Sequence, residues 1–539
     1  MSNLLRGTML LTGASFLSKF LGMVYVIPFT NIVEEEGMTL YSYAYTPYSI
    51  ILSISTVGVP LAVSKFVSKY NALDDYHTSM RMFKWGLSLM AITGFLAFLV
   101  LFFGAETIAR FTIDPRTEDI TIDDVKHVIQ MVSVALIIIP AMSIVRGFFQ
   151  GHQSMGPTAV SQVVEQIVRI LFLLISVFII MVLLNGDVTV AIGYATFAAF
   201  IGGLASFTVL YWYWQKRKAY IKDNVIKQKK KSNIPKVHLF QELFRYAGPF
   251  VLVGIATPLY QLVDQFTFSR AMAEIGQEDI SSIAYSSFNL QGHKLVIIPV
   301  TIATGLSLAL LPEITKAFNL NQMTRVKNQI NQALQIIMFF VLPSVFGLMI
   351  LSDEIYGSLF GYRTIEISGP LFAWYTPVAL CFAFFTVTSS ILQGIEQQRF
   401  TVISLTVGLL IKILCNALMI QMIGGAKGAI LTTIVASGAA VFLNLWQIKK
   451  TIGFPYRKFM KLTALMGIFT AIMSIILLLL KWLLGIILNF DDNRLIAFIV
   501  VMITVTIGGI IYLYLSYVST LLERVIGKKI RPLDKLFGR

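Results

Sequence analysis

Charged residues are scarce in this chain of 539 residues. They make up 13% of it, where soluble domains carry about 25%, while hydrophobic residues make up 56% and the mean hydropathy is +0.76. This composition excludes a water-soluble globular protein. The apolar residues fall in runs of about 20, the length of helix that crosses a bilayer. The chain is therefore predicted to cross a membrane many times.

Cysteine and histidine are almost absent. Cys381 and Cys415 both lie in apolar runs without a CxxC spacing, which excludes a disulfide framework and a zinc knuckle. The five histidines are scattered, and no HExxH, GxSxG or GxxxxGK[ST] motif occurs. No catalytic residue and no metal site is predicted from these residues, and ATP hydrolysis on a phosphate-binding loop is excluded. A secondary transporter, not an enzyme, is the class that the sequence favours.

A span-sized window predicts fourteen transmembrane helices. They are 8–32, 42–63, 85–105, 127–149, 158–184, 188–214, 246–270, 281–311, 329–351, 370–393, 400–421, 426–448, 462–488 and 495–519. Most of the 43 Lys and Arg residues fall on connectors that share the side of the N-terminus, whereas acidic runs such as Glu34-Glu35-Glu36 fall on the other side. Because basic residues are retained in the cytoplasm, both termini are predicted to be cytoplasmic. The net charge of +15 thus reflects topology, not nucleic-acid binding.

The chain contains an internal repeat with an offset of 243 residues. The recurring positions are Gln150-Gly151, Thr158, Ser161 and Arg169, which return as Gln393-Gly394, Thr401, Ser404 and Lys412. Two parallel six-span units are typical of transporters whose lobes rock around a central site. We predict an all-α membrane protein with an N-lobe at 1–214, a basic cytoplasmic linker at 215–240, a C-lobe at 241–450, two extra lipid-facing helices within 451–520, and a basic cytoplasmic tail at 521–539.

The basic residues inside apolar spans include Lys19, Arg169, Lys294 and Lys412. A charge at the centre of a span costs roughly 2.5–3.5 kcal/mol, so each should face water, a partner or a ligand. Arg169 and Lys412 occupy matching repeat positions, and an anionic ligand would stabilise two cations that approach one central volume. Lys19 and Lys294 lie at nearly matching places in the two lobes and are predicted to bind an anion. Snorkelling toward the interface is the alternative for these two lysines.

The spans also contain two acidic residues, Glu165 and Asp264. Glu165 is spaced i,i+4 from Arg169, and this spacing predicts a structural ion pair on one helix face. Asp264 is the one acid predicted in the spans of the C-lobe, where a carboxylate can bind Na⁺, exchange a proton or pair with a lysine. Asn416 and Thr433 offer neutral oxygen ligands for a coupling cation. Ordinary hydrogen bonding between packed helices is the alternative for these two.

Short apolar motifs resemble a known family. They are SKFLG at 18–22, VGVP at 57–60, Gln150-Gly151 and LLPE at 310–313. Together with the span pattern, they make the chain similar to the MurJ/SpoVB branch of the multidrug/oligosaccharidyl-lipid/polysaccharide exporter superfamily. The resemblance implies a flippase in the bacterial plasma membrane that moves an undecaprenyl-diphosphate-linked sugar, the peptidoglycan precursor lipid II, to the outer leaflet by alternating access.

The resemblance also implies where the diphosphate binds. Lys19 matches a cation of the first span in such proteins and Lys294 one of the eighth, and Arg169, Lys412 and Arg146 complete the predicted cationic set. The family has a second arginine where this chain has Tyr25, and residues 48–56 contain no cation. Relatives place a cation near the position of Asp264, with Asn416 and Thr433 close by.

Other functions and partners stay open from the sequence. A flippase for another polyprenyl-linked glycan and a cation-coupled multidrug exporter are the alternatives, although the cations in the spans outnumber the acids. A non-transporting scaffold would not need repeated ionisable residues in its spans. The expected partners are the lipid-linked substrate, membrane lipids and the cell-wall synthesis machinery, with a monomeric chain. No cofactor is predicted apart from Na⁺ or H⁺ coupling or use of the membrane potential.

Overall fold

The computed structural model describes residues 24–56, 73–113, 120–152, 154–227, 236–487 and 493–526, with short stretches inside 13–22 and 63–71. Every regular element in this part of the chain is a helix. The chain forms two compact units, Met1–Ser282 and Ile283–Arg539. The predicted divisions at 214, 240, 450 and 520 stay predictions.

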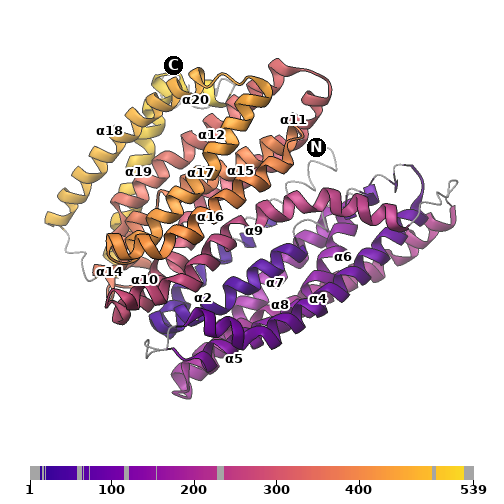
Figure 1. Ribbon diagram of the computed structural model, residues 1–539, viewed down its shortest axis with the longest axis horizontal. Coiled ribbons are helices and arrows are strands. Elements are labelled where there is room, and N and C mark those ends of the chain that lie inside the picture. The colour runs from indigo at the N-terminus through magenta and orange to yellow at the C-terminus, as the bar shows by residue number, and fades with distance from the viewer. Residues whose placement is uncertain are drawn as a thin grey trace. The chain divides into compact units, whose positions relative to one another are not determined.

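The first unit is a bundle of long helices (Figure 1). Its elements are α2 (Val26–Thr56), α4 (Tyr76–Thr112), α5 (Ile122–Ser133), the 3-10 turn Val134–Ile137, α6 (Ile139–Gly151), α7 (Met155–Phe178), the π-helical turn Ile179–Leu183, α8 (Val188–Lys227), α9 (Lys236–Glu274), and, at the boundary, the 3-10 turn Glu278–Ile280. Helix α7 packs along α8, and α5 packs against both α4 and α8. Gly202 of α8 permits the first of these contacts, because a Cβ there would lie 2.8 Å from the carbonyl oxygen of Glu165.

Two features of this unit refine the predicted connectors. Helix α2 is broken at Glu34, whose φ of 55° and ψ of −165° are not helical. The break falls within the acidic connector predicted between the first two spans. Helix α8 continues to Lys227, so the first half of the predicted basic linker is helical. No glycine or proline interrupts residues 215–227, and Lys216 lies over the ring of Trp212, 3.6 Å from its centre.

The second unit begins with a short helix that bridges the boundary and continues as a second bundle (Figure 1). Its elements are α10 (Ser281–Ser286), the π-helical turn Ser287–Gly292, α11 (His293–Asn319), α12 (Met323–Ile350), α13 (Ser352–Phe360), α14 (Ile365–Tyr375), α15 (Val378–Gly394), α16 (Gln398–Ile423), α17 (Ala426–Ile452), α18 (Arg457–Ile487), α19 (Arg494–Val518) and α20 (Leu521–Ile526). Helix α16 packs along α17, and α11 packs along α15.

Helices α18 and α19 correspond to the two extra predicted spans. One side of them packs into an apolar cluster with α12 and α20 that contains Phe339, Met466 and Tyr512. The other side exposes large apolar side chains, among them Ile475 (58%) and Trp482 (65%). This division into a packed face and an exposed apolar face is what a helix at the border between protein and lipid requires.

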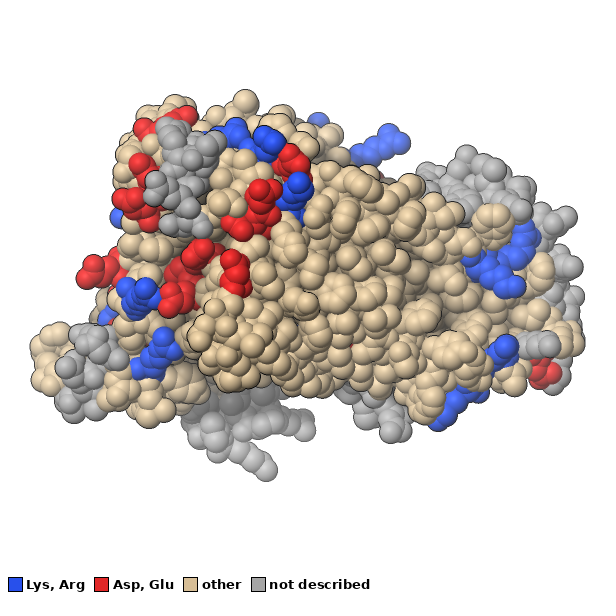
Figure 2. All heavy atoms as spheres, turned by 90° about the horizontal axis from the view of Figure 1, so that it is seen from below, with Lys and Arg blue, Asp and Glu red and all other residues tan. Residues whose placement is uncertain are grey.

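Ten helical segments of the described residues are long and apolar enough to cross a membrane. They are Tyr76–Thr112, Ile122–Gly151, Met155–Leu183, Val188–Ile221, Met323–Ile350, Ile365–Gly394, Gln398–Ile423, Ala426–Ile452, Arg457–Ile486 and Arg494–Val518. Each coincides with a predicted span, and the chain is a multi-pass membrane protein. The other four predicted spans, 8–32, 42–63, 246–270 and 281–311, stay predictions. On the face that Figure 2 shows, described charged side chains gather toward the two ends and leave an apolar middle.

Candidate functional site

Arg146 and Glu165 form an ion pair between α6 and α7. The Nη2 atom of Arg146 lies 2.6 Å from Oε2 of Glu165, and both side chains are about one-fifth exposed. The same guanidinium donates to Ser161 Oγ at 3.0 Å and to Ser206 Oγ of α8 at 2.7 Å. Arg146 thus joins three helices. The predicted pair of Glu165 with Arg169 is corrected: among the described residues, the ion-pair partner of Glu165 is Arg146.

Arg169 of α7 lies instead in a tyrosine cradle, which we define as Tyr25, Tyr41, Tyr45 and Tyr48. Its Nη2 atom donates to the Tyr41 hydroxyl at 3.2 Å, and its guanidinium carbon lies 5.4 Å from the centre of the Tyr45 ring. The rings of Tyr41 and Tyr45 stack at 5.5 Å. Hydroxyls and π-faces hold a guanidinium without cancelling its charge. Arg169 is partly exposed.

Lys412 of α16 occupies the matching repeat position but has a different environment. It is fully buried. Its Nζ donates to Asn416 Oδ1 at 2.9 Å, to the carbonyl oxygen of Ala429 at 2.9 Å and to Thr433 Oγ1 at 2.7 Å. We call these four residues the ammonium cluster. Lys412 was predicted to face an open cavity, but in the structure it is buried and donates to three oxygens of α16 and α17.

Lys294 lies at the start of α11, two residues beyond the π-helical turn Ser287–Gly292, and it is partly exposed. Short π-helical turns inside helices often mark functional positions. Its neighbour His293 hydrogen-bonds through Nδ1 to the Tyr375 hydroxyl at 3.0 Å. The structure thus places the second predicted lysine on an irregular helix, whereas Lys19 lies outside the described residues.

Asp264 of α9 is 3% exposed. The next residue, Gln265, is also buried, and its Nε2 donates to the Tyr43 carbonyl oxygen at 2.8 Å and to Thr112 Oγ1 at 3.1 Å. These bonds tie α9 to α2 and α4. Asp264 belongs to the first unit and the ammonium cluster to the second.

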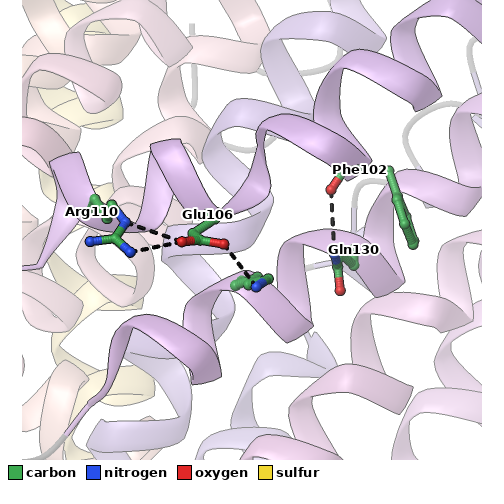
Figure 3. A network of polar contacts seen from close by, with 5 residues as sticks. Phe102, Glu106, Arg110 and Gln130 are labelled. Atoms are coloured by element: carbon green, nitrogen blue, oxygen red, sulfur yellow. Dashed lines mark hydrogen bonds and ion pairs between the residues drawn. The ribbon is translucent and has the colours of Figure 1, made fainter.

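A separate charged network joins α4 to α5 (Figure 3). Glu106 accepts from Arg110 Nη2 at 2.8 Å and from Lys126 Nζ at 2.9 Å. One turn away, Gln130 Nε2 donates to the Phe102 carbonyl oxygen at 3.4 Å. The Glu106–Lys126 and Gln130–Phe102 contacts link the two helices, and the Glu106–Arg110 pair is exposed on α4. Among the described residues, no group of three or more His, Cys, Asp or Glu side chains could hold a metal ion.

Comparison with known proteins decides the family. The profile of the polysaccharide biosynthesis protein family matches residues 4–318. The lipid II flippase MurJ of Bacillus subtilis (strain 168) is 44% identical over 532 residues, which cover 98% of each chain. The chain belongs to the MurJ family.

Solved structures agree with this membership in the family. A structure titled as lipid II flippase MurJ in an inward closed conformation matches with a TM-score of 0.66 and 17% identity over 96% of this chain and all of that one. An inward-facing MATE multidrug transporter matches with a TM-score of 0.64 and 15% identity, over 82% of this chain and 94% of that one. At these identities the matches show the fold. The relatives are transporters and not enzymes.

The tyrosine cradle of this MurJ-family chain is not among the features predicted from the sequence. Tyr41, Tyr45 and Tyr48 are spaced by four and three residues, which places them on one face of a helix. This spacing indicates a tyrosine-lined helix face. Arg169, which contacts these tyrosines, is more than a hundred positions away, so the tyrosine spacing alone does not identify it as their partner.

Proposed function

We propose that this chain is a lipid II flippase, which moves the undecaprenyl-diphosphate-linked precursor from the cytoplasmic to the outer leaflet by alternating access. The observation that carries the proposal is the 44% identity to the Bacillus subtilis MurJ flippase over 98% of both chains. A diphosphate must lose its hydration to cross hydrocarbon, and basic side chains replace that hydration. The polyprenyl tail can stay in lipid.

Three cations are proposed to bind the diphosphate: Lys19, Lys294 and Arg169. Lys294 and Arg169 are partly exposed, and the tyrosine cradle keeps the guanidinium of Arg169 charged and oriented. The other two predicted cations have internal partners that suit a structural role. Arg146 is paired with Glu165, and Lys412 is buried in the ammonium cluster.

The proposed setting is a bacterial plasma membrane with both termini in the cytoplasm, where one monomer acts beside the cell-wall synthesis machinery. Lys and Arg concentrate on the connectors assigned to the cytoplasm. In Figure 2, the end of the visible face that carries the acidic side chains also carries Lys and Arg, and the other end carries mainly Lys and Arg. The distribution of Lys and Arg over the predicted connectors supports the proposed orientation.

We propose the membrane potential as the main driving force. Moving one negative charge outward from a negative interior gains about 2.3 kcal/mol per 100 mV. Asp264 is the candidate for an additional Na⁺ or H⁺. In an Asp264→Asn variant, unchanged activity and ion dependence would remove this residue from the coupling mechanism.

Conditional depletion of the chain, in a strain without other lipid II flippases, tests the function. Lipid II exposed on the outer leaflet is measured against the pool retained inside. We expect exposure to fall while the inner pool stays intact or grows. Unchanged exposure would contradict the proposal and favour another polyprenyl-linked glycan or a drug as the cargo.

A further inference from the structure

The ammonium cluster joins two adjacent predicted spans through one fully buried lysine. Lys412 Nζ lies 2.7–2.9 Å from three oxygens: an amide oxygen of α16, a backbone carbonyl oxygen of α17 and a hydroxyl oxygen of α17. The three acceptors converge on a single nitrogen. Helices α16 and α17 are antiparallel neighbours joined through Gly424 and Gly425, so the lysine cross-links them away from their turn.

The hydrogen-bond directions identify the charged form of this lysine. The Ala429 carbonyl oxygen can only accept. The Thr433 hydroxyl already donates its hydrogen to that same carbonyl at 3.0 Å, so it presents a lone pair to Lys412. The Asn416 contact is made by its oxygen. Three acceptors require three hydrogens on the nitrogen, and only the ammonium form of lysine supplies them.

Oxygens of these three kinds are also the ligands that hard metal cations prefer. Asn416 and Thr433 were accordingly predicted as ligands for a coupling cation. In the structure these residues do not fit a free metal ion, because a unit positive charge already lies between them. A second cation among the same oxygens would be repelled at close range in a medium of low dielectric constant.

We infer that Lys412 is a tethered cation, which takes the place of a metal ion between α16 and α17 and makes this helix junction independent of Na⁺. Arg169, at the matching position of the other repeat, is partly exposed and rests on tyrosines. The two repeat positions therefore differ: one holds a partly exposed cation and the other an internal cross-link. Only the consequence for transport, that this junction adds no Na⁺ requirement, rests on the proposed function.

Removal of the tether gives a direct test. In Lys412→Ala the oxygens remain and a space opens between them, so an added cation can enter. In Lys412→Met the side chain fills that space without a charge and serves as the matched control. The full-length protein and both variants are purified in detergent, and their thermal unfolding is compared in NaCl and in choline chloride of equal ionic strength.

We expect the same unfolding midpoint in both salts for the wild type, and lower midpoints for both variants. Na⁺ should raise the midpoint of Lys412→Ala by about 2 °C when it is a hundredfold above its dissociation constant, and should leave Lys412→Met unchanged. Equal responses of the two variants to Na⁺, or no response from Lys412→Ala, would overturn the assignment.

A second variant covers the case in which Lys412→Ala does not fold. Thr433→Val is nearly isosteric and keeps the lysine while it deletes one acceptor. Its midpoint should fall equally in both salts. A Na⁺-dependent rise in the wild type that Thr433→Val abolishes would show that the cluster binds the metal ion and would refute the tether. Unfolding does not require flipping, so failure of the lipid II exposure test would leave these results intact.

Discussion

The guanidinium of Arg169 donates a hydrogen bond of 3.2 Å to the hydroxyl of Tyr41, a residue 128 positions earlier in the chain. The contact links α7 to α2 and holds the arginine over the Tyr45 ring. A charge held by neutral groups keeps its capacity to bind an anion. This is the physical basis for assigning Arg169 to the diphosphate.

Substitutions of Arg169 and Tyr41 should separate charge from orientation. Arg169→Ala should abolish lipid II exposure on the outer leaflet, and Arg169→Lys should retain part of it because a cation remains. Tyr41→Phe keeps the stacked ring and loses the hydrogen bonds of the hydroxyl to Arg169 and to Tyr25, each of which contributes about 1 kcal/mol. In the Tyr41→Phe variant, the amount of lipid II exposed on the outer leaflet should stay within a few-fold of the wild-type amount. Full activity of Arg169→Ala would exclude the arginine from the site.

Lys19 and Lys294 should be required for function but not for insertion. Each Lys→Ala variant, as the sole copy, is expected to accumulate in the membrane and fail to support growth. Each Lys→Arg variant should support growth because it keeps the charge. Growth and membrane abundance are measured together, and normal growth of either alanine variant would remove that lysine from the proposed binding set.

Glu165→Gln should destabilise the first unit. The substitution leaves Arg146, whose side chain is 17% exposed, with a neutral amide oxygen in place of its carboxylate, and hydrogen bonds to charged groups contribute about 1.5–3 kcal/mol. The unfolding midpoint of the purified protein should fall by several degrees. Glu106→Gln, in the exposed network of Figure 3, is the matched control and should have a smaller effect. Equal shifts would mean that the Arg146 pair contributes no more than a surface contact.

Lys481 fastens α18 to α13. Its Nζ lies 2.8 Å from Oε1 of Glu354, a carboxylate that is 3% exposed, and it donates to the Ile350 carbonyl oxygen at 3.2 Å. Lys481→Met leaves that carboxylate without this partner and should lower the free energy of unfolding by about 3 kcal/mol. The double variant Lys481→Met, Glu354→Gln should recover part of the loss, because no unpaired charge remains. Additive effects in this double-mutant cycle would show that the two residues are not coupled.

His152, in the connector between α6 and α7, should make stability depend on pH. Burial lowers the pKa of its imidazole, and the nearby Arg217 lowers it further, against a hydrogen bond to the Phe148 carbonyl oxygen that raises it. The unfolded chain therefore takes up a proton first as the pH falls through about 6.5, and the folded state loses stability. The unfolding midpoint should drop between pH 7.5 and 5.5. His152→Asn should show a smaller drop, and an identical drop would assign the dependence to other groups.

The amino-acid sequence by itself determined the class of protein and the position of ten membrane-spanning helices. A span depends on the length of a local apolar run, as at 85–105 and 495–519, and a run can be counted without knowledge of its neighbours. Arg169 and Lys412 also stood out from the sequence, because a charge in an apolar run is costly wherever the helix packs.

Only the tertiary structure decided which groups these charges meet. Glu165 has a basic residue four positions later on its own helix, yet it pairs with Arg146 of another helix, since the meeting of α6, α7 and α8 brings that guanidinium closer. Lys412 and Arg169 occupy equivalent positions in the sequence repeat. In the structure they differ, because α17 packs a carbonyl oxygen and a hydroxyl group against Lys412 and buries it. Partners of a side chain are set by which helix faces come together, and local spacing along one helix does not contain that information.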